Sequence, residues 1–198
     1  MIINENDPRV KRSKQLIKDA FTKLMMERDF ESITVKDITE LATINRATFY
    51  AHYEDKYQLL ETLFLELFNQ TLAERNIEHN PFNLETLEKL ILALCDYFKR
   101  IKMGCKKITS SVMSLMEEKI ICRLTTLIKE LVKHSTDKKN VITEDIELSI
   151  IMVSWSIYGV ALHWNSDKRT SQELLAASSA KLIQNGYGDV LFSIGTFA

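Results

Sequence analysis

A five-residue stretch, RATFY at residues 46–50, carries side chains suited to contacting a nucleic acid. Arg46 can read guanine or hold a phosphate, and the methyl groups of Ala47 and Thr48 can touch thymine. The hydroxyl of Tyr50 can reach a backbone phosphate. Each residue alone is a weak signal, because a tyrosine is often half-buried in a core. Together they are typical of a recognition helix, which presents its N-terminal residues to base edges.

The neighbouring residues predict a helix-turn-helix that positions this stretch. Thr34 and Asp37 form a variant of the capping box, in which side-chain oxygens accept hydrogen bonds from the free amides of a helix start. Asn45 is a favourable N-cap for a short second helix. Phe49 and Tyr53 are four residues apart, so both can face the core and leave the other side chains outward.

Basic residues on both sides of the motif extend the predicted contact surface. Lys56 opens the next helix, where a cation and free amides can take a phosphate. The basic run between Arg9 and Lys18 can lie along a phosphate backbone, although a solvated charge run is an equal alternative. A three-helix bundle without a role in DNA binding is the other interpretation of this region. The predicted DNA-contacting residues are Lys11, Arg12, Thr34, Lys36, Asn45, Arg46, Ala47, Thr48, Tyr50, His52 and Lys56.

As a set, these residues resemble the N-terminal domain of the TetR family of bacterial transcriptional regulators. The resemblance covers residues 10–71, and hydrophobic, cap, turn and surface positions agree at once. Two positions depart from the family pattern: Thr43 stands where glycine is common in the turn, and Tyr53 replaces phenylalanine. The matching positions are Ile17, Ala20, Phe21, Leu24, Phe30, Ile33, Thr34, Val35, Asp37, Ile38, Ala42, Ile44, Arg46, Ala47, Thr48, Phe49, Tyr50, His52, Tyr53, Lys56, Leu59 and Leu60.

The resemblance implies two domains and a mode of action. Residues 10–71 would form the DNA-binding domain, with the helix-turn-helix at residues 34–53, and residues 72–198 a domain for effector binding and dimerisation. Such a regulator would be a homodimer that binds a palindromic operator on double-stranded DNA. It would act as a repressor that a small effector releases. Control by a protein partner instead of a small molecule, with activation as a further possibility, is the alternative.

The composition predicts an all-α chain. Only two prolines and five glycines occur among 198 residues, and 45% of the residues are hydrophobic. Apolar residues recur at helical spacing, which predicts about nine helices: a three-helix head with the helix-turn-helix, then a larger helical body. The formal net charge of −1 is not the basic balance that is common among nucleic-acid binders. The position of the cations therefore matters more than their number.

The sequence gives little support for catalysis, a cofactor or a metal site. It has no glycine-rich phosphate loop, no nucleophile motif and no cluster with metal-ligand spacing, so an all-α enzyme is a remote alternative. Cys95, Cys105 and Cys122 form no paired pattern, and we expect them to be small core residues in a cytoplasmic protein. The N-terminal residues lack the apolar segment of a signal peptide.

Two C-terminal helices predict a dimer interface. Residues 148–164 have no formally charged side chain unless His163 is protonated, and a membrane span is disfavoured by the short length and the serines. A helix that is apolar all round is more simply buried between its own domain and a second copy. A capping box of Thr170 and Glu173 predicts the start of the next helix, which is rich in small residues and ends near Gly186. The predicted interface residues are Trp155, Gly159, Leu162, Leu175, Ser178, Ser179 and Leu182.

Methionines and aromatic residues of the body suggest an effector pocket. Flexible methionines beside aromatic rings suit a hydrophobic or amphipathic small molecule, although such a stripe is more often plain core. In the body we expect one helix at residues 108–116 and a separate one at 117–134, and we assign no role to the apolar tail at 187–198. The candidate pocket residues are Phe98, Met103, Met113, Met116, Trp155, Tyr158 and His163.

Overall fold

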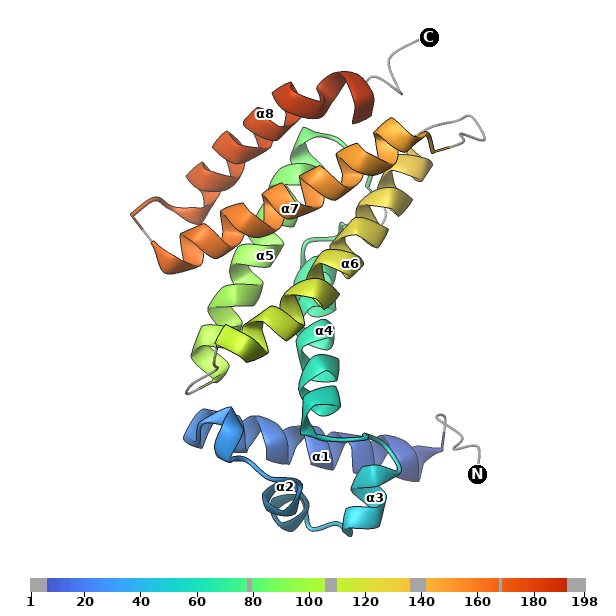
Figure 1. The fold of residues 1–198 in the computed structure, drawn as a ribbon, viewed down its shortest axis with the longest axis vertical. Coiled ribbons are helices and arrows are strands. Elements are labelled where there is room, and N and C mark those ends of the chain that lie inside the picture. The colour runs from blue at the N-terminus through green and yellow to red at the C-terminus, as the bar shows by residue number, and fades with distance from the viewer. Residues whose placement is uncertain (1–6, 78–79, 106–109, 136–141, 168, 192–198) are drawn as a thin grey trace. The chain divides into compact units, whose positions relative to one another are not determined.

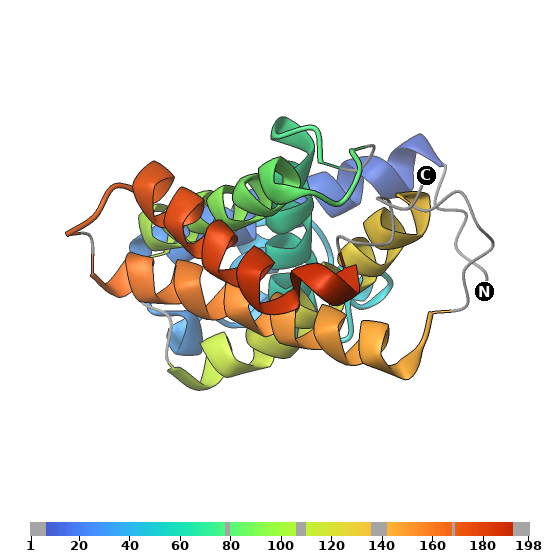
Figure 2. The same cartoon turned by 90° about the horizontal axis from the view of Figure 1, so that it is seen from above.

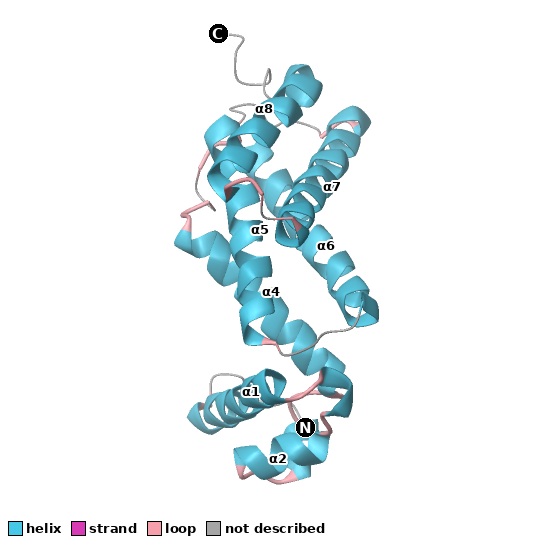
Figure 3. Ribbon diagram, turned by 90° about the vertical axis from the view of Figure 1, so that its left-hand side faces the viewer, coloured by secondary structure: helices cyan, strands magenta, loops and turns pink. Residues whose placement is uncertain are grey.

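The computed structural model describes residues 7–77, 80–105, 110–135, 142–167 and 169–191. Within these ranges the regular structure is helical, which confirms the predicted all-α class (Figures 1 and 3). The α-helices are α1 (Pro8–Glu27), α2 (Val35–Ala42), α3 (Arg46–Tyr50), α4 (Lys56–Glu74), α5 (Leu84–Gly104), α6 (Ser110–His134), α7 (Glu144–Ser166) and α8 (Gln172–Leu191), and a 3₁₀ helix, η1, spans Phe30–Ser32.

The chain forms two compact units. The first comprises residues 1–66 together with 100–116, and the second comprises residues 67–99 together with 117–198. Three helices, α4, α5 and α6, each begin in one unit and end in the other. The predicted division after residue 71 stays a prediction, because the division by compactness follows a different course along the chain.

Helix α1 begins and ends where its sequence requires. The carboxylate of Asp7 accepts a hydrogen bond from the Arg9 amide at 2.8 Å, and Pro8 takes the first helical position, where no amide hydrogen is needed. The helix ends before Arg28, whose backbone is extended. Its apolar stripe supplies core residues at helical spacing, and the buried residues are Ile17, Ala20, Phe21, Leu24 and Met25.

Two short helices complete the core of the first unit. Helix α2 lies against α1 and α3, as Figure 1 shows. Phe30, Ile38 and Phe49 are buried from three different elements, and each such side chain contributes roughly 1.5–3 kcal/mol by leaving water. The rings of Phe21 and Phe30 meet edge to face, with centroids 6.2 Å apart. These residues fix the spacing of helices that are too short to be stable alone.

The second unit is organised by an aromatic chain and a pair of helices. Ring centroids of Phe68 and Tyr97 lie 5.5 Å apart, those of Tyr97 and Phe98 5.4 Å, and those of Phe98 and Tyr158 5.5 Å. Helices α7 and α8 lie side by side in both views (Figures 1 and 2). Burial raises the pKa of Tyr158 far above its ordinary value, with the Glu117 carboxylate as a further cause. Tyr158 is therefore a protonated, structural tyrosine at neutral pH.

Two expectations for the body were wrong. Residues predicted as two helices, at 108–116 and 117–134, form the single helix α6 from Ser110 onward, which reduces the helix count to eight α-helices in the described ranges. The junction holds no glycine, proline or cap, and the buried residues Val112, Met116 and Ile120 continue one stripe through it. Residues 108 and 109 lie outside the described residues.

The start and end of α8 also differ from the prediction. The side chain of Ser171, and not of Thr170, accepts a hydrogen bond from the Leu174 amide, at 3.2 Å. The carbonyl of Thr170 instead accepts from Nε1 of Trp164 at 2.9 Å, which places Thr170 before the cap. The helix continues past Gly186 to Leu191, so the first residues of the presumed tail are helical, and residues 192–198 lie outside the described residues.

The three cysteines occupy different environments. Cys95 is fully buried, which raises the pKa of its thiol to about 12 and leaves it unreactive at neutral pH. Burial also raises the pKa of Cys105, to about 11. The expectation that all three are core residues was wrong for Cys122, which is exposed on α6. Its position in the helix lies between buried residues and therefore gave no sequence signal.

Helix α7 is long and apolar enough to cross a membrane, and among the described residues no other helix meets that test. Length and composition alone are weak support for a span, because core helices share them. One face of α7 is buried by its own unit, and this face includes Ile150, Val153 and Ile157. The opposite face carries exposed apolar side chains, among them Met152 and Trp155.

The turn between α2 and α3 contains a strained residue. Thr43 has φ 54° and ψ 46°, the left-handed region that favours glycine. Its amide donates to Glu40 O at 3.2 Å and the next amide, of Ile44, donates to Thr39 O at 3.0 Å. This is the hydrogen-bond pattern of a Schellman motif, which satisfies the last carbonyls of α2. The motif forces the left-handed angle onto a β-branched residue.

Replacing Thr43 with glycine should therefore stabilise the chain. The strain costs about 1–2 kcal/mol, part of which the larger backbone entropy of unfolded glycine offsets. We expect Thr43→Gly to raise the free energy of unfolding in urea by about 0.5–1 kcal/mol. The matched control, Glu40→Gly at an exposed position inside α2, should lower it by about 1 kcal/mol. A loss of stability in Thr43→Gly would contradict this account of the turn.

Candidate nucleic-acid interface

Helix α3 exposes the residues that the sequence places outward. Asn45 Oδ1 accepts a hydrogen bond from the Ala47 amide at 2.9 Å and so caps the helix. Phe49 is fully buried, and its ring lies 5.5 Å from Tyr50 and 5.8 Å from Tyr53, centroid to centroid. Tyr50 is 58% exposed. Burial of one face leaves the other face of α3 to solvent.

The remaining α3 residues of the predicted set divide by exposure. Arg46 and Ala47 are exposed, and Thr48 is half-buried. A cation, a methyl group and the phenol of Tyr50 therefore share the outer surface of one helix. This is the combination of groups that reads bases and holds phosphates. Direct contact of these residues with DNA stays a prediction.

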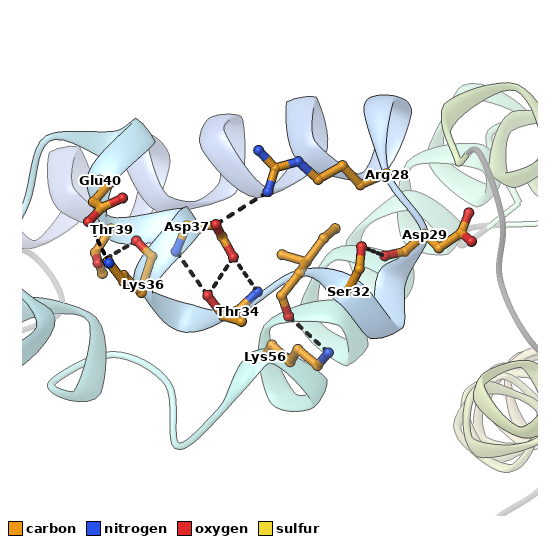
Figure 4. A network of polar contacts seen from close by, with 10 residues as sticks. Arg28, Asp29, Ser32, Thr34, Lys36, Asp37, Thr39, Glu40 and Lys56 are labelled. Carbon is orange, nitrogen blue, oxygen red and sulfur yellow. Dashed lines mark hydrogen bonds and ion pairs between the residues drawn. The ribbon is translucent and has the colours of Figure 1, made fainter.

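The start of α2 is held by a reciprocal network (Figure 4). The Asp37 amide donates to Thr34 Oγ1 at 3.2 Å, and the Thr34 amide donates to Asp37 Oδ2 at 2.8 Å, which completes the predicted capping box. The Thr34 hydroxyl donates to the same carboxylate, and Arg28 Nη1 lies 3.2 Å from Asp37 Oδ1. The Thr34 hydrogen bonds are the main cause of the lowered pKa of Asp37. The Thr34 hydroxyl is therefore engaged within the capping box. The predicted contact of Thr34 with DNA stays a prediction.

Lys56 occupies a cage of backbone carbonyls. Its Nζ donates to Phe30 O at 3.0 Å, to Glu31 O at 3.1 Å and to Ile33 O at 2.9 Å. The same nitrogen lies 4.5 Å from the ring centroid of Phe30 and 5.5 Å from that of Tyr57. We call the three carbonyls the Lys56 cage. Burial lowers the pKa of Lys56, and the Glu31 carboxylate opposes that effect.

A contact that local sequence patterns did not predict links α1 to the residues that follow α3. Ser13 Oγ lies 2.6 Å from His52 Nε2, although the two residues are 39 positions apart. They line a crevice of about 490 Å³ together with Arg9, Val10, Ala47, Thr48 and Ala51. His52 is half-buried, and its Nδ1 is buried without a hydrogen-bond partner among the described residues. Burial is the main cause of the lowered pKa of His52, and the Lys14 charge adds to it.

The predicted basic residues lie in different surroundings. Lys11 and Arg12 are exposed on α1, as phosphate contacts would need to be. Lys36 is exposed on α2 and lies 3.7 Å from Glu40 in an ion pair one turn apart. Lys18, which is in the same basic run, pairs with Glu66. The run therefore includes both a residue with a partner inside the unit and residues that face solvent.

The predicted pocket residues do not share one environment. Phe98, Met116 and Tyr158 are buried, and Met113 is half-buried. His163 is exposed. The last two residues of the set, Met103 and Trp155, are 74% and 49% exposed. Helical spacing does not separate the inner from the outer residues of such a stripe, so a pocket lined by the whole set stays a prediction.

The predicted dimer residues lie on the adjacent helices α7 and α8. Trp155 is 49% exposed and Leu182 72% exposed. Gly159 is exposed, and a side chain added there would meet nothing within 4 Å. Ser178 is also exposed. The remaining three residues are half-buried: Leu162, Leu175 and Ser179.

The structure adds apolar residues to this surface. Leu148, Ile151 and Met152 are 52%, 39% and 51% exposed and share a face of α7 with Trp155, at spacings of three and four residues. Leu174 on α8 is 62% exposed. We call these five residues with Leu182 the α7–α8 apolar face. The sequence signal was present, because residues 148–164 of α7 are mostly apolar, but it did not show which side chains remain exposed.

Acidification should test the environment of His52. Its folded pKa lies below the ordinary 6.5, so the unfolded chain binds a proton more readily. The stability that this difference contributes is fully present above pH 6.5 and is lost as the pH falls through the folded pKa. We expect the urea midpoint of the wild type to fall more than that of His52→Gln between about pH 7.5 and about pH 5.5. Parallel pH curves for the two proteins would contradict this assignment.

Comparison with known proteins bears on the first unit above all. Residues 17–63 match the family described as bacterial regulatory proteins, tetR family. The HTH-type transcriptional regulator YxbF of Bacillus subtilis (strain 168), which has not been characterised, is 35% identical over 91 residues. The match covers 44% of this chain and 24% of that protein, so the chain spans about a quarter of the length of this relative.

Solved structures share the fold over most of the chain. The TetR transcriptional regulator from Streptococcus agalactiae 2603V is 23% identical, with a TM-score of 0.59, over 89% of this chain and 96% of that one. The transcriptional regulator FadR from Bacillus subtilis, in complex with stearoyl-CoA, is 19% identical, with a TM-score of 0.51, over 87% of this chain and 98% of that one. The family match therefore covers the helix-turn-helix region, residues 17–63, and the solved structures show that the chain shares the fold of these regulators.

Proposed function

We propose that the chain is a sequence-specific DNA-binding regulator of transcription in the cytoplasm, and that it represses its target genes. The observation that carries the proposal is α3, where a buried Phe49 and an Asn45 cap hold a short helix whose outer surface carries Arg46 and Tyr50. In a helix-turn-helix, the second helix enters the major groove by its N-terminal residues. The Ala47 and Thr48 methyls then lie within the same segment as the base-reading cation.

A second copy of the chain is the partner that the body supports best. The α7–α8 apolar face exposes side chains that a stable surface would bury, and a patch of this kind commonly marks an interface. A two-fold dimer uses the same surface on both copies. It would present two α3 helices to half-sites one turn of DNA apart, about 34–36 Å, and would favour a palindromic operator.

A small hydrophobic or amphipathic effector is proposed to release the operator. FadR from Bacillus subtilis, which shares the fold, was solved with stearoyl-CoA, so long-chain acyl thioesters are reasonable first compounds to test. A ligand releases DNA only if it binds the DNA-incompetent arrangement more tightly. The alternative is control by a protein that docks on the α7–α8 apolar face, in which case the sign of regulation could also be activation.

The DNA-reading proposal is tested by selecting sites from random duplex DNA with the full chain. We expect enrichment of a palindrome. On the enriched site, Arg46→Ala should lose about 1–3 kcal/mol and relax sequence preference, whereas Tyr50→Phe should weaken binding to all sequences. Lys99→Ala, which removes an exposed cation from α5 in the other unit, serves as the control and should change neither affinity nor preference.

If a folded dimer enriches no DNA sequence after bound effector has been removed by unfolding and refolding, the proposed sequence-specific binding is contradicted. Equal loss by Arg46→Ala on selected and random DNA would assign Arg46 to a phosphate and not to a base. In that case the sequence preference must come from other residues of α3 or from DNA shape.

The dimer proposal predicts that a charge on the α7–α8 apolar face separates the copies. We expect Trp155→Glu to weaken self-association in sedimentation by at least about tenfold, because the carboxylate would be buried without a partner. Leu115→Glu makes the same kind of change at a residue of α6 that is 54% exposed, and should leave the dimer intact. A wild-type chain that sediments as a monomer at micromolar concentration would contradict the proposal.

A further inference from the structure

Lys56 stands where the electrostatics of its own helix disfavour a cation. It is the first residue of α4, and the free amides at a helix start carry partial positive charge. Burial makes the position less favourable still and lowers the pKa of the side chain. The ammonium must therefore be stabilised by something outside α4.

The Lys56 cage supplies that stabilisation from the end of η1. A backbone carbonyl oxygen carries partial negative charge and has two lone pairs, so it can accept from a cation even where it already accepts from an amide. Three carbonyls, those of Phe30 and Glu31 in η1 and that of Ile33 directly after it, converge on the same nitrogen at 2.9–3.1 Å. An ammonium has three hydrogens to donate, so the cage uses all of them. None is left for a phosphate oxygen while the cage is intact.

The walls of the cage hold the side chain in one place. The ring of Phe30 lies edge to face with that of Tyr57, 5.1 Å between centroids, and both rings lie within 5.5 Å of the Lys56 nitrogen. The Tyr57 hydroxyl lies 3.3 Å from the Glu31 carboxylate. Lys56 and Tyr57, consecutive residues of α4, therefore both contact residues 30–33, through backbone carbonyls, an aromatic ring and a carboxylate.

The cage joins the two ends of the helix-turn-helix. The Ile33 carbonyl immediately precedes Thr34, which caps α2, and Lys56 immediately follows the loop that leaves α3 (Figure 4). The two residues are 23 positions apart, and both α2 and α3 lie between them. A rotation of the start of α4 would carry the ammonium away from carbonyls that are fixed to the start of α2.

We propose that Lys56 is a positioning residue of the DNA-binding unit: its ammonium ties the start of α4 to η1 and to Ile33 directly after it, and thereby fixes the orientation of α3. The proposal rests on the proposed function, because orientation matters only if α3 reads DNA. It replaces the expectation that Lys56 itself holds a phosphate. An operator-specific complex needs α3 in one orientation, whereas non-specific binding depends on phosphate charge alone.

Lys56→Arg and Lys56→Met separate positioning from phosphate contact. Arginine keeps the charge and can hold a phosphate, but its planar guanidinium cannot point three hydrogens at the converging carbonyls. Methionine keeps the length without charge or donors. We expect both variants to bind the selected operator about tenfold more weakly, with random DNA changed by less than about twofold. The slope of log affinity against log salt should stay unchanged, because no phosphate contact is lost.

A direct phosphate contact gives the opposite pattern and would overturn the proposal. Lys56→Arg would then retain affinity, and Lys56→Met would lose equally on operator and random DNA while its salt slope falls by about 0.9. Wild-type operator affinity in both variants would overturn it as well. The control is Lys23→Met, which removes an exposed lysine of α1 and should leave both affinities unchanged. Urea unfolding of each variant shows whether it is folded at the assay temperature.

Hydrogen exchange of the free protein gives a readout that does not depend on DNA. The amides of Ser32 and Ile33 donate to Asp29 O and Phe30 O, so they report on the η1 end that the cage holds. Both Lys56 variants should accelerate exchange at these amides, with the amide of Ile150 in α7 unaffected. Unchanged exchange at Ser32 and Ile33 would overturn the positioning role even if the wild type selects an operator. Faster exchange together with no operator selection by the wild type would refute only the proposed function.

Discussion

The burial of Phe49 is the interaction on which the proposed DNA reader depends. Helix α3 spans only Arg46–Tyr50, and isolated helices shorter than about 12 residues are marginal in water. The fully buried ring contributes roughly 1.5–3 kcal/mol, and the Asn45 cap about 1 kcal/mol more. The stability of α3 thus comes from its inner face and its start. The exposed residues of α3 are not needed for that stability, so their types can vary with the DNA sequence that the helix is proposed to contact.

A second constraint is that the backbone amides and carbonyls at the ends of η1 and α2 need hydrogen-bond partners. Carbonyls of η1 and of Ile33 accept from Lys56, the Asp37 amide in α2 donates to the Thr34 hydroxyl, and the Thr34 amide donates to the Asp37 carboxylate. At the far end of α2, a Schellman pattern uses its carbonyls and holds Thr43 in the left-handed region. The carbonyls of η1 therefore have a partner from α4, and both ends of α2 have local caps.

Local sequence signals predicted this region well, and long-range partners were not predictable. The capping box of Thr34 and Asp37 and the Asn45 cap were visible because their partners lie within three residues. The Lys56 cage was missed because its carbonyls lie 23 to 26 positions away and belong to the backbone, which every residue type shares. Lysine at a helix start was therefore interpreted as a phosphate ligand. The link between Ser13 and His52 was missed for the same reason.

In the body, periodicity predicted helices but not their ends or their partners. An unbroken apolar stripe at Met116 continues α6 through a position where no residue type stops a helix. For α8, the sequence predicted a cap at Thr170, but the Ser171 side chain accepts from the Leu174 amide and the Thr170 carbonyl accepts from the Trp164 indole. Local patterns leave such choices open, because tertiary contacts of this kind are fixed by packing.

Helix α7 shows the same limit with a functional consequence. Hydropathy does not distinguish Tyr158, which is buried in the aromatic chain of its own unit, from Trp155, which is half exposed three residues earlier. Both faces are apolar, but only the inner face is removed from water when the chain folds, so only that face contributes hydrophobic free energy to folding. The outer face is removed from water only when two chains associate, and the resulting stabilisation grows with chain concentration. If two copies pair through the outer face, burial of its apolar side chains stabilises the dimer. The dimer then joins two α3 helices, each of which binds DNA weakly alone, into one operator-binding unit.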